Sequence, residues 1–103
     1  MKLSKIMDSF SLALLITKII AEMNLLELKG CVIVPEETKI RGNKKHPTIQ
    51  VLCLYAIQGT FVHENRMPLH ALTKNLVDGR EYIEVVIRNM LIDLNNYFRR
   101  RNG

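Results

Sequence analysis

The chain has 103 residues, of which 48% are hydrophobic, so it is long enough to bury one core and too short for several. Aromatic residues make up 6% and Trp is absent, which leaves Leu, Ile, Val and Met to fill the core and favours helix packing over a sandwich or barrel. The net charge of +5 favours a partner rich in phosphates, and no apolar run approaches the roughly 20 residues that cross a bilayer.

The basic charge is concentrated in two short segments. The first segment contains Lys39, Arg41, Lys44 and Lys45, and the second contains Arg99, Arg100 and Arg101. No acidic residue interrupts either cluster, as expected of a surface that contacts phosphates. The alternative is that both segments are solvated loops that keep the protein soluble.

Residues 3–28 contain neither Pro nor Gly and carry apolar side chains at helical spacing on two sides. A helix that is apolar on two sides must be covered twice, and little chain remains to do so. The sequence therefore predicts a homodimer with this long N-terminal helix in the interface, while a central helix wrapped by its own chain is the alternative. The predicted interface side chains are Leu12, Leu15, Ile16, Ile19 and Met23.

Two observations bear on the compartment. Cys31 and Cys53 lie in apolar surroundings, which predicts buried free thiols in a reducing environment rather than a disulfide. Asp8 and Lys18 bracket the apolar run of the first helix, and no small-residue cleavage site follows it, so a signal peptide is not expected. A cytoplasmic protein without membrane contact is predicted.

The next segment is expected to be irregular. Gly30 should end the first helix with a positive φ, and the β-branched run 31–34 is stopped by Pro35, which predicts a brief edge strand or an extended link. A basic loop, KIRGNKKH, follows over 39–46, and its Gly42 and Asn43 suit a tight turn such as a hairpin tip.

A mostly interior helix is predicted over 49–58, closed by Gly59 and followed by a polar connection. The stretch 69–90 then has the pattern of a helix-turn-helix, in which Leu residues share one side of a first short helix and residues 77–79 interrupt the pattern. The second helix keeps an apolar face to Phe98, either unbroken or bent near Asp93. The sequence thus predicts one mainly α domain over 1–103, with a tri-helical helix-turn-helix core over 47–91 and a basic tail over 92–103.

The segment 47–91 resembles the winged-helix regulators of the MarR-like type. The similarity rests on the apolar spacing of PTIQVLCLYAI, LHALTKNL and REYIEVVIRNML. It implies a DNA-binding protein whose long N-terminal helix takes part in dimerisation, with little or no β-wing because no sequence after the third helix would form one. A fainter similarity, to the PapB-type fimbrial regulators, rests on residues 62–66, 76–79, 84–85 and 95–98 and requires two small insertions.

This resemblance implies that the start of the last helix enters the major groove. Arg80 would bind guanine or a phosphate, Tyr82 a phosphate or a thymine methyl group, and Glu81 or Glu84 a cytosine amino group. Solvated acids at a helix start are the alternative for the two glutamates, and the simpler one. The predicted DNA-binding residues are Arg80, Glu81, Tyr82, Glu84 and Arg88 on this helix, with Lys39, Arg41, Lys44, Lys45, Arg99, Arg100 and Arg101 as phosphate contacts.

An enzyme is not predicted, because the sequence contains no P-loop, GxGxxG, HExxH or CxxC motif. The spacing of His46, His63, His70 and Cys53 fits no familiar metal site, so neither a metal nor a cofactor is expected. The predicted function is that of a dimeric, sequence-specific protein on an inverted repeat of double-stranded DNA: a transcriptional regulator, or a phage or plasmid partition or replication-control factor. The alternative is an all-helical protein–protein interaction protein whose basic ends only solvate it.

Overall fold

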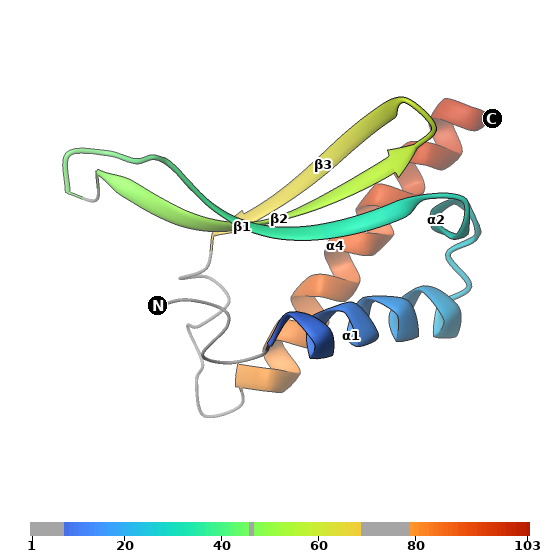
Figure 1. Cartoon of the computed structure of the whole chain (residues 1–103), viewed down its shortest axis with the longest axis horizontal. Coiled ribbons are helices and arrows are strands. Elements are labelled where there is room, and N and C mark those ends of the chain that lie inside the picture. Colours follow the sequence, from blue (N-terminus) through green and yellow to red (C-terminus); the bar gives the residue numbers. More distant parts are fainter. Residues whose placement is uncertain (1–7, 46, 69–78) are drawn as a thin grey trace.

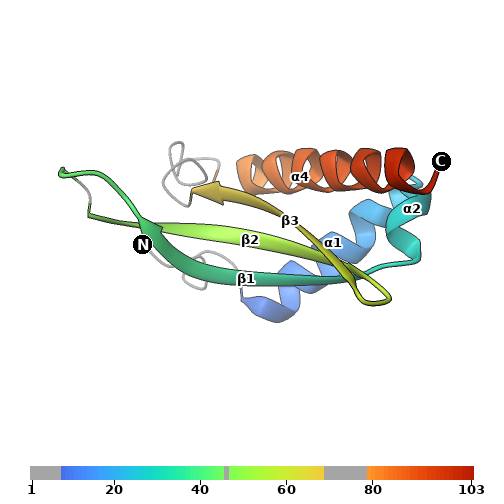
Figure 2. The same cartoon turned by 90° about the horizontal axis from the view of Figure 1, so that it is seen from above.

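The computed structural model describes residues 8–45, 47–68 and 79–103, with residues 79–82 described by their backbone alone. The elements are α1 (Ser9–Glu22), α2 (Leu26–Lys29), β1 (Val32–Arg41), β2 (Thr48–Gln58), β3 (Phe61–Pro68) and α4 (Gly79–Asn102). The strands form an antiparallel sheet in the order β1-β2-β3, and the helices lie on one of its faces (Figures 1 and 2). The fold is therefore α+β, and the prediction of a mainly α protein with a tri-helical core is wrong.

The strand β2 occupies the segment for which a helix is predicted. It is the central strand and is buried on both sides: Leu52 and Leu54 belong to the core under the helices, while Val51 and Cys53 face the other way and are 1% and 0% exposed. A strand buried on both faces is a continuous apolar run, and periodicity does not distinguish such a run from a buried helix. The run 49–58 is therefore predicted as a helix, and the predicted fold class is mainly α instead of α+β.

The strand β1 is longer than the brief strand predicted, because it continues through Pro35 to Arg41. The backbone N–H of Gly42 donates to the carbonyl of Pro47 at 2.9 Å. Since hydrogen-bonded positions alternate along an antiparallel pair, the even-numbered residues of β1 bond to β2. Pro35 therefore turns its missing N–H toward the free edge of the sheet, where proline is tolerated.

The strand β3 replaces the predicted polar connection, and its residues alternate between the two faces of the sheet. Phe61 and Met67 pack against the core, and the Asn65 side-chain amide donates to the carbonyl of Met90 in α4 at 3.2 Å. The intervening residues, Glu64 among them, face away from the helices. Alternation of this kind is typical of a strand covered on one side only.

Gly59 and Thr60 join β2 to β3 in a two-residue loop closed by the pair Gln58 and Phe61. Gly59 has a φ of 62°, whereas Thr60 is not among the described residues with positive φ. A positive φ at the first loop position alone is the pattern of a type II′ hairpin turn, for which glycine is preferred.

Replacing this glycine, Gly59→Ala, is expected to lower the free energy of unfolding by about 1–2 kcal/mol, the cost of the left-handed region for an L-residue. No heavy atom lies within 4 Å of the added Cβ, so the cost is conformational rather than steric. Urea denaturation measures the loss, with Thr60→Ala as the neighbouring control. Equal midpoints for the two variants would contradict the assigned turn.

The helix predicted over 3–28 is divided in the structure. Asn24 adopts a φ of 51° between α1 and α2, a conformation that Asn tolerates better than most residues. Gly30, for which a positive φ is predicted, has a φ of −90° instead. The short α2 is held against α4, because the side-chain oxygen of Asn95 accepts a hydrogen bond from the Glu27 N–H at 3.1 Å.

Asp8 caps the N-terminus of α1. Its carboxylate accepts hydrogen bonds from the Ser11 backbone N–H at 2.7 Å and from the Ser11 hydroxyl at 3.2 Å. The backbone hydrogen bond first, and then the hydroxyl bond, lower the pKa of Asp8 below its ordinary value. A carboxyl group with a lowered folded pKa stabilises the fold above its unfolded pKa, and this contribution disappears as the pH falls through the folded pKa.

We therefore expect Asp8→Ala to lower the thermal midpoint at neutral pH, and the difference between variant and parent to close in strong acid. Thermal unfolding followed by circular dichroism across a pH series measures both effects. Asp93→Ala, at an exposed position in the middle of α4, is the control. A difference that is the same at neutral and acidic pH would show that the carboxylate is not the cap.

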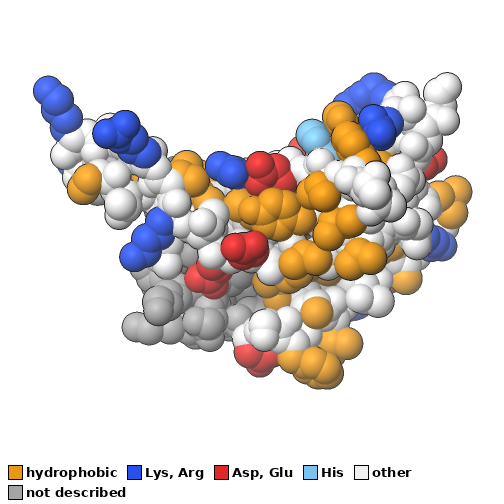
Figure 3. All heavy atoms as spheres, turned by 45° about the horizontal axis from the view of Figure 1, so that its top comes forward, with side chains coloured by type: hydrophobic (Ala, Val, Ile, Leu, Met, Phe, Trp, Pro, Cys, Tyr) orange, Lys and Arg blue, Asp and Glu red, His pale blue; other side chains and the backbone are white. Residues whose placement is uncertain are grey.

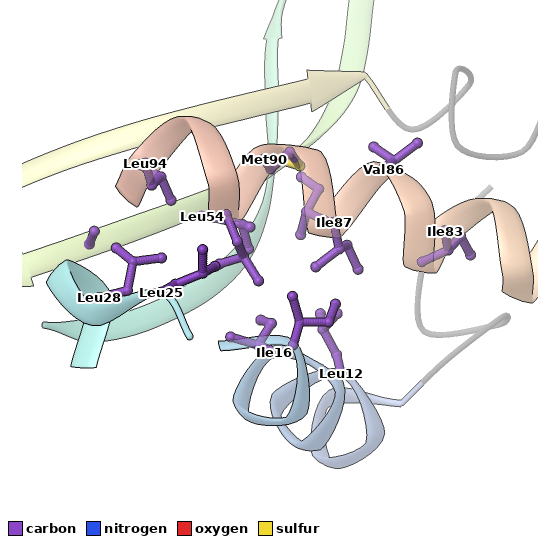
Figure 4. Packing of buried hydrophobic residues seen from close by; sticks show 14 of the residues in the cluster. Leu12, Ile16, Leu25, Leu28, Leu54, Ile83, Val86, Ile87, Met90 and Leu94 are labelled. Carbon is purple, nitrogen blue, oxygen red and sulfur yellow. The ribbon is translucent and has the colours of Figure 1, made fainter. Parts of the chain in front are cut away.

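The helix α4 confirms the predicted last helix, and it is unbroken at Asp93. Its buried stripe repeats at helical spacing, and each member is at most 1% exposed: Ile83, Ile87, Met90, Leu91, Leu94 and Phe98. Figure 4 shows Leu12 and Ile16 of α1 pointing toward Ile87. The first helix of the predicted helix-turn-helix, over 69–76, lies outside the described residues.

Candidate nucleic-acid interface

The basic loop predicted over 39–46 includes the tip of a projecting β-hairpin. Among the described residues, β3 pairs with β2 from Val51 to Gln58, while residues 39–41 of β1 and 48–50 of β2 pair only with each other. Figure 1 shows this hairpin extending beyond β3 and away from the helices. We call residues 39–45 and 47–50 the arm. The predicted hairpin is confirmed, but residues 39–41 of the predicted loop belong to β1.

The charge of the arm is entirely positive. Lys39, Arg41, Lys44 and Lys45 are all exposed, and the arm contains no acidic residue. Within the described part of the chain, no ion pair joins any of the four to a carboxylate. Cations on a narrow, two-stranded projection can approach phosphate groups from several directions.

The strand register gives the arm two chemically different faces. On the face continuous with the helix-covered side of the sheet, Lys39 lies opposite Gln50, and Arg41 lies opposite Thr48. On the other face, Ile40 lies opposite Ile49. Sequence reasoning missed Thr48 and Gln50, because a helix over 49–58 does not place them beside the basic residues. Gly59 and Thr60, a glycine-containing pair directly after an apolar run, were the available signal for a hairpin instead.

The three C-terminal arginines lie at the opposite end of the molecule from the arm. They form the last turn of α4, and the longest dimension of the molecule, which has the arm at one end and these arginines at the other, is 42 Å (Figure 2). The guanidinium of Arg101 lies 3.5 Å from the centroid of the Phe61 ring, and all three arginines complement the negative end of the helix dipole. Arg99 and Arg100 are exposed.

An aromatic cluster joins β3 to α4 beneath these arginines. The His63 ring stacks on Tyr97 with centroids 3.6 Å apart, and Phe61 meets Phe98 edge-on at 5.9 Å. These contacts hold the C-terminal half of α4 against the sheet. The helix end that carries the C-terminal arginines is therefore fixed against the sheet by packing.

The predicted base-reading residues all lie on α4. Arg80, Glu81 and Tyr82 belong to its first turn, and their side chains lie outside the described residues. Glu84 and Arg88 form an ion pair of 3.5 Å one turn apart on the helix surface. This pair favours the simpler explanation of Glu84 as a solvated helix acid. The tri-helical frame that would present this helix to a groove is not formed, because β2 replaces its first helix.

The structure places most of the predicted dimer-interface residues inside the chain's own core. Leu12, Ile16 and Ile19 are buried, Leu15 packs against the same core, and Met23 is partly exposed. On the opposite side of α1, the Phe10 side chain is 72% exposed. The side of α1 proposed for the dimer is thus covered by the same chain, mainly by α4 (Figure 4).

The open face of the sheet, away from the helices, is apolar at one end. Val32, Val34 and Val62 are exposed there, and on the same face Arg66 forms a two-pronged ion pair with Glu64 at 2.9 and 3.2 Å, which raises the pKa of Arg66. Figure 3 shows apolar and acidic side chains gathered between Lys and Arg side chains at the two ends of the molecule. This face is less suited to phosphates than the arm.

Of the four side chains considered for a metal site, the structure describes two, and these do not come together. His63 and Cys53 lie on opposite faces of the sheet, and His46 and His70 lie outside the described residues. Among the described residues, no group of three His, Cys, Asp or Glu side chains could hold a metal ion. Both cysteines are free thiols, but only Cys53 is buried as predicted, whereas Cys31 is half-buried. Burial and then Glu27 raise the pKa of Cys31. No helix in the described ranges is long and apolar enough to span a membrane.

No protein-family model matches the chain, and neither the curated proteins nor the solved structures give a significant match. The similarities to MarR-like and PapB-type regulators remain predictions from the sequence. Function must therefore be inferred from the geometry of the described residues.

Proposed function

We propose that the protein binds double-stranded nucleic acid, DNA in the first place, through the arm. The observation that carries the proposal is a projecting hairpin with four exposed cations and no acid. Neutralising phosphates releases counterions, which supplies most of the sequence-independent affinity for a duplex. A two-stranded β-ribbon also fits the major groove, which is about 12 Å wide.

The exposed arginines at the end of α4 are the second phosphate contact in this proposal. The longest dimension of the molecule, 42 Å, sets the upper limit of their distance from the arm and corresponds to about 12 base pairs at a rise of about 3.4 Å. One duplex contacts both groups only when it runs along this dimension. Arg99 and Arg100 should then add to the salt dependence of binding, as the arm does.

The role that best suits this activity is that of a regulator, or of a partition or replication-control factor, with two copies on an inverted repeat. Because most of the helix side chains predicted for the dimer are in the core, the two copies would meet through other surfaces. Light scattering tests this part separately: a dimer has twice the 11.9 kDa of the single chain.

The open face of the sheet favours the alternative, a protein–protein interaction protein, because exposed apolar patches often mark binding surfaces. Three exposed valines cover only a small part of the roughly 800 Å² per partner that a standard interface buries. The arm, by contrast, brings all four of its cations to the surface. DNA binding is therefore the first proposal.

Fluorescence anisotropy with a labelled duplex DNA of mixed sequence, at low and at physiological salt, tests the proposal. We expect a dissociation constant of about 10⁻⁴–10⁻⁶ M or tighter at physiological salt, and stronger binding at low salt. A duplex RNA and a single-stranded DNA of equal length show which form of the phosphate backbone is preferred. The absence of duplex binding even at low salt would overturn the proposal.

A further inference from the structure

We infer that the polar face of the arm reads base edges, with Arg41 and Gln50 as its specificity-determining residues. This inference rests on the proposed function, and it assigns sequence recognition to the sheet hairpin rather than to a helix. It begins from the strand register, which places Lys39 beside Gln50 and Arg41 beside Thr48 on one face.

The chemistry of these four side chains suits the major groove. Arg binds the O6 and N7 atoms of guanine with two hydrogen bonds, Gln binds the N6 and N7 atoms of adenine in the same way, and Lys and Thr make single contacts. Lys39, Arg41 and Thr48 are exposed, and Gln50 is half-buried. No carboxylate in the described residues forms an ion pair with Lys39 or Arg41. Both cations are therefore available to a ligand.

The spacing of the polar face also matches a duplex. Side chains two residues apart on one face of a strand are about 6.8 Å apart, which equals two base-pair steps of about 3.4 Å. Side chains directly opposite each other on neighbouring strands are about 4.5–5.5 Å apart. Lys39 and Arg41 would therefore meet bases two steps apart, with Gln50 and Thr48 beside them.

The other parts of the arm are less suited to base recognition. Ile40 and Ile49 on the opposite face offer no hydrogen bond to a base edge. Lys44 and Lys45 lie in the turn between the strands, beyond the paired residues, where they can contact phosphates. In this inference the polar face of the arm recognises bases, and the lysines at its tip bind phosphates.

The test is selection from a random duplex DNA library with the full chain, followed by titration of the selected sequences. We expect the parent to select an adenine at one position and Gln50→Ala to lose that preference, a change of about 5- to 150-fold between the preferred and the next base. The salt slope should stay the same, because no charge is lost. Gln58→Ala is the matched control, since Gln58 is also half-buried and on the same face of β2, but at the far end beside Phe61.

A second variant, Arg41→Lys, keeps the charge and removes the two-pronged geometry. It should lose a guanine preference while retaining affinity for random duplexes. Binding without any base preference, or the same selected sequences from parent and Gln50→Ala, would overturn this inference and leave the proposed function standing. No duplex binding at all would overturn both.

Discussion

Replacing Lys39, Arg41, Lys44 and Lys45 together with Ala is expected to remove most of the salt-dependent affinity for duplex DNA. On a duplex of mixed sequence, where no base is read, all four cations contact phosphates. Each such contact contributes about 0.9 to the slope of log affinity against log salt, so loss of four contacts should flatten this slope by about 3.6. A fourfold rise in salt would then weaken the parent about 150-fold more than the variant. The arm projects from the sheet, so the fold should survive the change.

Anisotropy titrations over a salt series measure this effect, and circular dichroism confirms the fold. The matched control replaces four exposed cations outside the arm: Lys18, Lys29, Arg99 and Arg100. Both variants have the same net charge, but only two of the control positions are proposed phosphate contacts. If the two variants flatten the slope equally, binding follows total charge and the arm is not the binding element.

Phe98→Ala is expected to have the largest effect on stability, a loss of about 3–5 kcal/mol in the free energy of unfolding. The Phe98 ring is fully buried and meets Tyr97 edge-on at 5.6 Å in the cluster that joins α4 to β3. Domains of this size are typically stable by about 5–15 kcal/mol, so the variant should be close to unfolding at room temperature. The substitution would leave a cavity between α4 and the sheet.

Urea denaturation measures this loss, with Val85→Ala as the control on the same helix. Val85 is 46% exposed, and surface changes of this kind usually shift stability by less than about 0.5 kcal/mol. A Phe98 variant that is as stable as the Val85 variant would contradict the role of α4 as the centre of the core.

Much of α4 and of the arm could be predicted from the sequence. Ile83, Ile87 and Leu94 repeat at helical spacing on a segment without Pro or Gly after Gly79, and all are buried in the structure. Gly42 and Asn43 marked the hairpin tip by their turn preference. The apolar repeat of α4 follows from its one buried face, and the hairpin tip follows from a local backbone conformation. Both depend on residues that are close together in the sequence.

The predictions that failed concern β2 and β3. Leu52 and Cys53 belong to a run that is apolar at every position, so the helical and extended periods fit it equally well. Its identity as a strand depends on β1 and β3 at its two edges, which are distant in the sequence or joined through a turn. The proposed base-reading pair of Arg41 and Gln50 could not be predicted from the sequence, because only strand pairing places these residues on one face.

The sequence by itself determined where the charge lies, which residues form the last helix and where the hairpin turns, because these properties arise within a few neighbouring residues. Only the tertiary structure decided that 49–58 is a strand and that the side of α1 predicted to form a dimer is covered by its own chain. It also decided that the basic segment projects as an arm with one polar face. These outcomes depend on strand pairing and on which layer covers each apolar surface, and both are set by contacts between distant segments.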